Sequence, residues 1–341
     1  MAKINEVATP PSPPTENRRR SISLGRWREY GQTYGTLVAL IVLIVINVII
    51  TPHFLSPNTI NTNLYQVAET MIVAMGMTLV IATGGIDLSV GSVMAIAGVL
   101  AALMLRDNSL HIGTGFGASL LIIVIAVLIA GLFGLFNGLL VTIFRIQPIV
   151  ATLILFIAGR GFASAMANGF VNFSDPLFSY IGTGTVIGIP FQAIVMLIIS
   201  IIFMWLVRTT VFGRAVVATG GNEPAARLAG ISVARVKLTV YIIIGLLSGL
   251  AGVFYVANNN SAEAPGIGLG MELNAIAAVA VGGSSFTGGQ ANVIGTFIGA
   301  LFIQLLNATL IANNVSADIA RVVEALVIIL AVYLQTQRKS A

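Results

Sequence analysis

Residues 84–92, Gly84-Gly85-Ile86-Asp87-Leu88-Ser89-Val90-Gly91-Ser92, separate two long apolar runs at 70–83 and 93–105. Two adjacent glycines can adopt backbone angles that a helix does not use, so we expect the first run to end here. Asp87 or Ser89 can then accept hydrogen bonds from the free amides of the next helix. A carboxylate is costly in hydrocarbon unless it is capped, paired or hydrated. Our preferred interpretation is a helix cap at a membrane edge. The alternative is that Gly84, Gly85, Asp87 and Ser89 gate or line a translocation path.

The composition is that of an integral membrane protein. Of 341 residues, 57% are hydrophobic and only 9% are charged. The apolar runs are too long and too many for a soluble core. Cysteine is absent, so neither disulfides nor thiolate metal sites can form. The two histidines, His53 and His111, fall in expected connecting loops and make a poor metal site.

Enzymatic chemistry is not expected in this chain. The nucleotide-binding pattern G-x-x-x-x-G-K-[ST] is absent, and no catalytic set can be assembled from two loop histidines without cysteine. We therefore expect no cofactor here. If cargo moves uphill with ATP, a separate ATPase chain must bind the ATP.

The apolar runs predict an all-α membrane protein of about ten transmembrane helices. They lie near 35–51, 64–83, 88–105, 115–143, 148–166, 189–207, 238–257, 272–286, 289–313 and 316–335. The run at 272–286 is short for a span, so a broken or re-entrant helix is expected there. The domain plan is a disordered basic tail (1–33), a transmembrane domain (34–337) that includes a cytoplasmic loop at 208–237, and a short cytoplasmic end (338–341).

Basic residues set the orientation. With ten spans, one side carries the arginines at 18–28, Arg145, the 208–237 loop and Arg338-Lys339, whereas the other carries mainly Arg106. Positive residues remain on the cytoplasmic side, so both termini should be cytoplasmic. The formal net charge of +5 reflects this bias, and we expect contact with membrane lipid and none with nucleic acid.

A second glycine-rich break, Gly282-Gly283-Ser284-Ser285-Phe286-Thr287-Gly288-Gly289, resembles the first. Gly84, Gly85 and Gly91 align with Gly282, Gly283 and Gly289, and a span rich in small residues follows each break. Interrupted helices at corresponding places indicate a transporter built from two related halves.

The cytoplasmic loop 208–237 contains a short helix pattern at 221–231. Asn222 can be the N-cap, Glu223 complements the positive helix end, Pro224 fits the first turn and Gly230 stops the helix. We expect Ala225, Ala226 and Ala229 to let this helix settle into a groove, and Glu223 and Arg227 to fix its register. Such a helix suits a docking surface for a cytoplasmic partner better than a plain connector.

Polar side chains within spans are few. Gln304 and Asn307 place two amides on one face of 289–313, and Arg321 and Glu324 can pair on one helix face. Arg160 lies within 148–166, and Glu69 and Glu272 each open a span. Structural pairing is our preferred interpretation for most of them. A role for Gln304 and Asn307 in the translocation path is the alternative.

Several of these strings resemble the permease subunits of bacterial ATP-binding cassette importers for ribose, xylose, arabinose and similar sugars. They are GGIDLSVGSVMAIAG at 84–98, GGNEPAARLAGI at 220–231, LSGLAG at 247–252 and ELNAIAAV at 272–279. Together they cover most of 64–335, in order. The segment RIQPIVATLIL at 145–155 further resembles a permease of the galactofuranose importer.

The resemblance implies an inner-membrane permease that pairs with a second copy or with a sister permease. It also implies a cytoplasmic ATPase, a periplasmic sugar-binding protein, and a coupling helix for the ATPase at 221–231. Two other classes remain open. One is a permease for branched-chain amino acids, and the other is a secondary transporter driven by an ion gradient.

Overall fold

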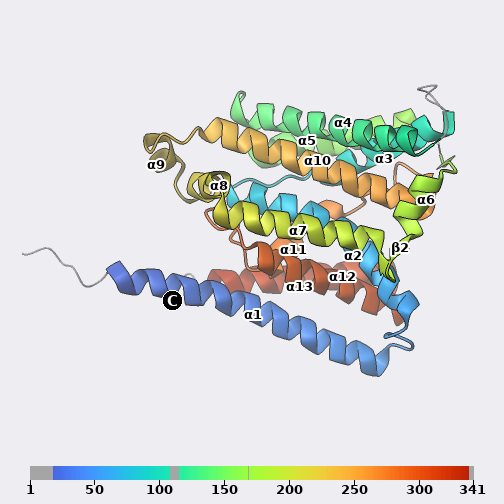
Figure 1. The fold of residues 1–341 in the computed structure, drawn as a ribbon. Helices are drawn as coiled ribbons and strands as arrows, with labels where there is room; N and C mark the ends of the chain where they lie inside the picture. The colour runs from blue at the N-terminus through green and yellow to red at the C-terminus, as the bar shows by residue number, and fades with distance from the viewer. Residues whose placement is uncertain (1–17, 108–114, 168, 338–341) are drawn as a thin grey trace, which may run out of the picture.

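The computed structural model describes residues 18–107, 115–167 and 169–337, which are almost entirely helical (Figure 1). The helices are α1 (Arg18–Ile50), α2 (Pro57–Ala82), α3 (Val90–Asp107), α4 (Phe116–Thr142), α5 (Pro148–Met166), α6 (Pro176–Thr183), α7 (Phe191–Thr209), α8 (Val211–Gly221), α9 (Glu223–Leu228), α10 (Val233–Asn259), α11 (Met271–Val281), α12 (Val293–Ala312) and α13 (Ala317–Gln337).

In the described residues, strands are confined to two short antiparallel pairs. β1 (Val171–Asn172) pairs with β4 (Ser261–Ala262), and β2 (Thr185–Val186) pairs with β3 (Ile189–Pro190). The all-α membrane class is therefore confirmed.

Eight helices in the described part of the chain are long and apolar enough to cross a membrane. They are α1, α2, α3, α4, α5, α7, α10 and α12. α11 has only 11 residues, fewer than the roughly 20 that a span needs. α13 has 21 residues but carries Asp318, Arg321 and Glu324. The count of about ten therefore stays a prediction that depends on α11 and α13.

The ends of the chain differ in part from the expected domain plan. α1 begins at Arg18, so its backbone is helical within the segment that the sequence assigns to the tail. Residues 1–17 and 338–341 lie outside the described residues, as does His111.

α2 forms the centre of the bundle. In the most apolar stretch of α2, 83% of the residues are buried. In the corresponding stretch of α1, which lies at the edge of the bundle (Figure 1), only 17% are buried. α10 packs against α2, α3 and α4, and α12 packs against α1, α2 and α11. The outer helices expose large apolar side chains such as Ile49 and Leu132, as expected of surfaces that face lipid.

Small residues allow the backbones of α4 and α10 to meet. A Cβ added at Gly134 would lie 3.0 Å from Cα of Gly245 and would collide with the carbonyl oxygen of Tyr241. Close approach of this kind replaces the hydrophobic force that is missing between helices in lipid. The helix pair is therefore held by direct backbone contact.

The two ends of the bundle carry different elements. α8, α9 and the start of α1 lie at one end, whereas α6 and β2 lie at the opposite end (Figure 1). Since α9 belongs to the 208–237 loop, we call the first the α9 end and the second the α6 end.

α2 and α11 end in the same way. After α2, the amides of Gly84 and Gly85 donate to the carbonyls of Ile81 and Val80 at 2.9 and 3.0 Å. After α11, the amides of Gly283 and Ser284 donate in the same pattern to Ala280 and Val279. Gly84 and Gly283 have φ of 80° and 87°, and each ends its helix in a Schellman motif.

These caps correct the alignment drawn from the sequence. By backbone conformation Gly84 corresponds to Gly283, and Gly85 to Ser284, so pairing Gly84 with Gly282 was wrong by one residue. The sequence pairing failed because two consecutive glycines leave it open which of them takes the left-handed conformation. The origin of the two halves from one repeat stays a prediction.

Candidate coupling and gating site

The two glycine-rich breaks meet each other at the α9 end. The amide of Gly289 in the second break donates to the carbonyl of Ala82 at the end of α2, at 2.9 Å. Gly220, at the end of α8, lies between them, because a Cβ there would collide with the Ala82 carbonyl oxygen and lie 2.7 Å from the Gly289 amide. Three segments far apart in sequence therefore share one backbone contact.

We call this contact the glycine junction and define it by Ala82, Gly84, Gly220, Gly221, Gly288 and Gly289. A Cβ at Gly288 would lie 2.8 Å from the Gly220 carbonyl oxygen and 3.0 Å from the Gly84 amide nitrogen. Side chains at Gly220, Gly288 and Gly289 would force the segments apart, so these glycines serve close approach as well as turning. α9 begins directly after Gly221 and Asn222, so the junction adjoins it.

Asp87 is buried in the first break, with 2% of its surface exposed. Its Oδ1 accepts hydrogen bonds from the Ser89 amide at 2.8 Å and the Ser89 hydroxyl at 2.7 Å. The Ser89 carbonyl accepts the first amide hydrogen bond of α3, from Val93. Asp87 therefore forms a local Asx turn with Ser89 directly before α3, and the capping role that we preferred stays a prediction.

Two further polar groups at this break were missed in the sequence. Asn137 of α4 donates to the Ser89 hydroxyl at 2.8 Å, and its Oδ1 has no partner in the described residues. The buried hydroxyl of Tyr241 also lacks a partner there. The available signal was the single asparagine of the apolar run at 115–143 and one of the two tyrosines of the run at 238–257.

Close packing, and not a positive φ, explains why position 85 requires glycine. A positive φ occurs at Gly84 and not at Gly85. A Cβ at Gly85 would lie 2.9 Å from the Tyr241 hydroxyl and 3.3 Å from a methyl group of Val80. Packing against α10 therefore excludes a side chain at Gly85.

α9 forms as its sequence predicts. Asn222 is the N-cap, and its side-chain oxygen accepts from the Ala225 amide at 3.0 Å. Pro224 lies in the first turn, where its missing amide costs nothing. Gly230 follows the helix with φ of 83°. The helix boundary signals were sufficient here because they are local.

The charges of α9 are paired within the chain. Glu223 accepts from Arg227 at 2.6 Å and from Lys237 of α10 at 2.7 Å. The hydrogen bond from Lys237, and then that from Arg227, lower the pKa of the Glu223 carboxyl below its usual range. These contacts tie α9 to the start of α10.

The exposed face of α9 differs from the expected one. Ala226 is buried, with 4% exposed, so it packs against the protein and does not face a groove in a partner. Leu228, which the sequence analysis did not select, is 91% exposed. Leu228, and not Ala226, is therefore the large apolar side chain that α9 presents to solvent.

The structure does not bring Gln304 and Asn307 to the breaks. Gln304 donates to Gln66 of α2 at 2.7 Å, and Asn307 donates to Glu324 of α13 at 3.3 Å. The two side-chain amides of α12 therefore bind different neighbouring helices. The expected ion pair between Arg321 and Glu324 is also replaced. Nη1 of Arg321 instead lies 3.3 Å from Oδ1 of Asp318.

A buried polar network lies near the α6 end. Asn258 donates to Glu69 at 2.7 Å, and Gln192 donates to Asn258 at 2.7 Å. Arg160 instead binds the backbone carbonyls of Ala264 and Gly268, at 3.1 and 3.4 Å. Long-range amide and carbonyl partners of this kind carry no signal in the linear sequence.

Metal binding has no support in the described residues, where no group of three His, Asp or Glu side chains comes together.

Comparisons with known proteins agree on one family. Residues 59–332 match the family described as "Branched-chain amino acid transport system / permease component". The chain is 38% identical over 312 residues to the galactofuranose transporter permease protein YtfT of Escherichia coli (strain K12), which covers 89% of each chain.

Other relatives are named for ribose. The chain is 39% identical to the ribose import permease protein RbsC of E. coli (strain K12), covering 89% of this chain and 94% of that protein. It is 40% identical to RbsC of Bacillus subtilis (strain 168), covering 91% and 94%. No solved structure matches the chain.

Proposed function

This chain belongs to the family of branched-chain amino acid transport system / permease components, and we propose that it is the transmembrane permease subunit of an ATP-binding cassette importer for a monosaccharide. The observation that carries this proposal is the 38–40% identity to sugar permeases over 89–91% of the chain. The chain is a transport subunit without enzymatic activity, and a separate ATPase supplies ATP hydrolysis.

Sugar cargo is favoured over amino acids. The family description mentions branched-chain amino acids, but the relatives that align over nearly the whole chain are named for galactofuranose and ribose. Those two sugars are therefore the first cargoes to test. An ion-gradient mechanism is not favoured, because two of these relatives are named import permeases and their match covers both breaks and α9.

α9 is the proposed contact for the ATPase. Asn222, Glu223, Pro224, Ala225, Ala226 and Arg227 build this short capped helix, and Leu228 extends from its end into solvent. The pairing of Glu223 with Arg227 and Lys237 supports a role in holding the helix rigid. The partner contact then falls mainly on Leu228 and the exposed Ala225.

The glycine junction is the proposed route from the ATPase to the membrane path. A movement of α9 displaces Gly220 and Gly221, which directly precede it. Because Gly220 touches both the Ala82 carbonyl and the Gly289 amide, both breaks must follow. Gly84, Gly85, Asp87 and Ser89 are accordingly the proposed gate. Gln304 and Asn307, half-buried on α12, are proposed to line the path beyond it.

The proposed location is the bacterial inner membrane, with both termini and the α9 end in the cytoplasm. The α6 end then faces a periplasmic sugar-binding protein, and a second copy or a sister permease completes the translocation path. A reporter fused at Ala341 should be active only if that reporter functions in the cytoplasm. Activity of a periplasmic reporter at the same place would overturn this orientation.

Uptake in proteoliposomes tests the proposal. The permease is reconstituted with its ATPase and binding protein, and labelled ribose or galactofuranose uptake is measured with and without ATP. We expect uptake to require ATP and to persist when a protonophore is added. Uptake that proceeds without ATP and stops with the protonophore would instead identify an ion-driven transporter.

A further inference from the structure

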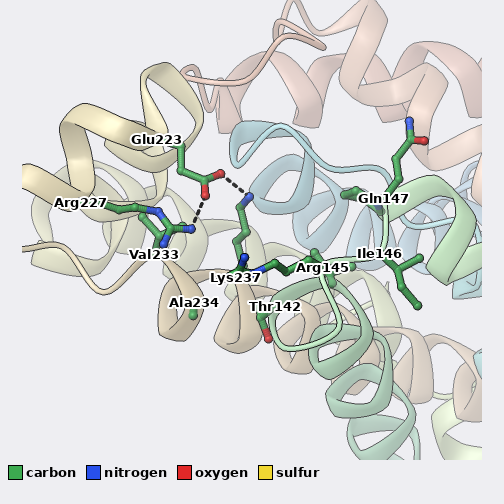
Figure 2. A pocket seen from close by; sticks show the side chains of 11 residues that line it. Thr142, Arg145, Ile146, Gln147, Glu223, Arg227, Val233, Ala234 and Lys237 are labelled. Atoms are coloured by element: carbon green, nitrogen blue, oxygen red, sulfur yellow. Dashed lines mark hydrogen bonds and ion pairs between the residues drawn. The ribbon is translucent and has the colours of Figure 1, made fainter.

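A cavity of about 630 Å³ opens between the turn that joins α4 to α5, the helix α9 and the start of α10 (Figure 2). Cavities of this size are typical of ligand sites. Three of its lining side chains are cations, Arg145, Arg227 and Lys237, and Glu223 is the one acid among them. Each of the three elements contributes at least one cation.

The cavity keeps an excess of positive charge. Glu223 is shared by Arg227 and Lys237. Within the described residues Arg145 forms no ion pair, and Figure 2 shows its side chain extending from the turn in the direction of α10. Arg145 has φ of 55°, a left-handed conformation that residues other than glycine rarely adopt. The turn thus presents an unpaired cation to the cavity in an uncommon backbone conformation.

Two helix starts add to this positive field. α5 begins at Pro148 and α10 at Val233, both of which line the cavity. Neither Gln147 nor Ser232 caps its helix with a side-chain hydrogen bond. Helix starts carry partial positive charge, so they reinforce the cations.

Apolar side chains lie directly beside the basic cavity. Ile143 and Phe144, just before Arg145, are 67% and 68% exposed, and Ile149 and Val150, just after Pro148, are also exposed. These residues lie at the adjoining ends of the candidate spans α4 and α5, where a bilayer is expected to change from acyl chains to head groups. Basic residues next to exposed apolar ones match the chemistry of a phospholipid.

We propose that this cavity binds the head group of an anionic phospholipid, with its phosphate at Arg145 and Lys237 and its acyl chains along Ile143 and Phe144. Basic pockets at the cytoplasmic ends of spans attract anionic lipids in this way. An acidic side chain of a partner protein, or a free phosphate, would make no use of the apolar rim. The proposal rests on the proposed cytoplasmic position of the α9 end, but it is independent of the cargo and of the ATPase contact at Leu228.

Native mass spectrometry of the full-length permease tests the proposal. The protein is purified in detergent and titrated with dioleoyl-phosphatidylglycerol or dioleoyl-phosphatidylcholine. We expect the unmodified permease to bind phosphatidylglycerol more tightly than phosphatidylcholine. Arg145→Gln should weaken it by about fivefold, and Arg145→Gln with Lys237→Gln by more than about tenfold, with phosphatidylcholine unchanged.

Two further variants separate the cavity from general surface charge. Arg235→Gln removes the same charge from an exposed place on α10 that does not line the cavity, and it should leave lipid binding unchanged. Glu223→Gln removes the one acid and should tighten phosphatidylglycerol by about fivefold. Because this arm predicts a gain, a misfolded variant cannot imitate it.

Four outcomes would overturn the proposal. The first is equal affinity for the two lipids, and the second is a loss for Arg235→Gln as large as for Arg145→Gln. The third is displacement of phosphatidylglycerol by inorganic phosphate at matched concentration, which would identify a free-anion site. The fourth is that Arg145→Gln reduces co-purification of the ATPase while lipid binding is unchanged, which would assign the cavity to a protein acid.

Discussion

The two glycine-rich breaks have the same backbone and different side-chain chemistry. Both end a helix in a Schellman motif, at Gly84 and Gly283, and both reach the glycine junction. The first is held from inside the bundle, by Asn137 of α4 and Thr152 of α5. The second is held from the edge, where Asn292 donates to Thr33 of α1 at 2.8 Å.

This difference separates two requirements. Glycine is needed wherever backbones touch or φ is positive, whereas the polar side chains decide which helices each break is fastened to. The first break is bonded to two fully buried side chains, Asn137 of α4 and Thr152 of α5. The second is bonded to the peripheral helix α1. We therefore expect loss of a polar contact in the first break to cost more than an equivalent loss in the second. A side chain at Gly220, which lies against both breaks, should cost most.

Gly220→Ala should have the largest effect, because its methyl group would collide with the Ala82 carbonyl and press on Gly289. Overpacking of this kind costs about 2 kcal/mol, and here it separates both breaks at once. We expect a fall of several degrees in the thermal midpoint and a more than tenfold loss of uptake. Gly221→Ala is the matched control, since its nearest contact would be 3.8 Å away. Equal effects of the two variants would contradict a junction centred on Gly220.

Asp87→Ala should have the next largest effect. It removes the acceptor of the Ser89 amide and hydroxyl, and leaving buried donors unpaired costs about 1–3 kcal/mol. Asp87→Asn keeps an oxygen acceptor, so uptake should largely survive if Asp87 only caps. Thermal stability and uptake are measured for both. A stable but inactive Asp87→Asn protein would show that the charge itself acts in gating.

Asn292→Ala is the counterpart of Asp87→Ala, because it removes the polar side chain that holds the second break. Its Oδ1 caps α12 by accepting from the Gly295 amide at 3.0 Å, and loss of a cap costs about 1 kcal/mol. Asn292→Asp keeps that acceptor and removes the hydrogen bonds donated to Thr33 and to the Gly282 carbonyl. We expect both variants to keep more uptake than Asp87→Ala. If the Asn292 variants lost more uptake than Asp87→Ala, the first break would not be the more sensitive of the two.

Gly84→Ala should have the smallest effect. A Cβ at Gly84 would have open space around it, so the cost is only that of a left-handed backbone, about 1 kcal/mol. Gly84→Asn should cost less, because asparagine tolerates this conformation. Denaturation of the purified protein measures both. Equal losses for alanine and asparagine would show that space, and not φ, is limiting at Gly84.

The sequence was a good guide where the signals are local. The caps of α9 and the ends of α2 and α3 were predicted, because Asn222, Pro224 and the paired glycines act within a few residues of themselves. The class of the protein was predicted from the apolar runs. The resemblance to sugar permeases agrees with relatives that match nearly the whole chain.

The rest depended on contacts between distant segments. Nothing local distinguishes Gly220 from Gly221, yet one lies against Ala82 and the other has room for a methyl group. The burial of Ala226 and the exposure of Leu228 depend on how α9 packs on its neighbours. The partners of Gln304 and Asn307, on α2 and α13, could not be read from their spacing on one helix.

The central claim, that the junction transmits docking at α9 to both breaks, is tested most directly by cross-linking at Leu228. Leu228→Cys should capture the ATPase in the assembled importer, both alone and in combination with Gly220→Ala. We predict that the cross-link yield is the same in the two proteins and that sugar uptake is lost only when Gly220→Ala is present. Full uptake with Gly220→Ala, or a cross-link that disappears together with uptake, would contradict the claim.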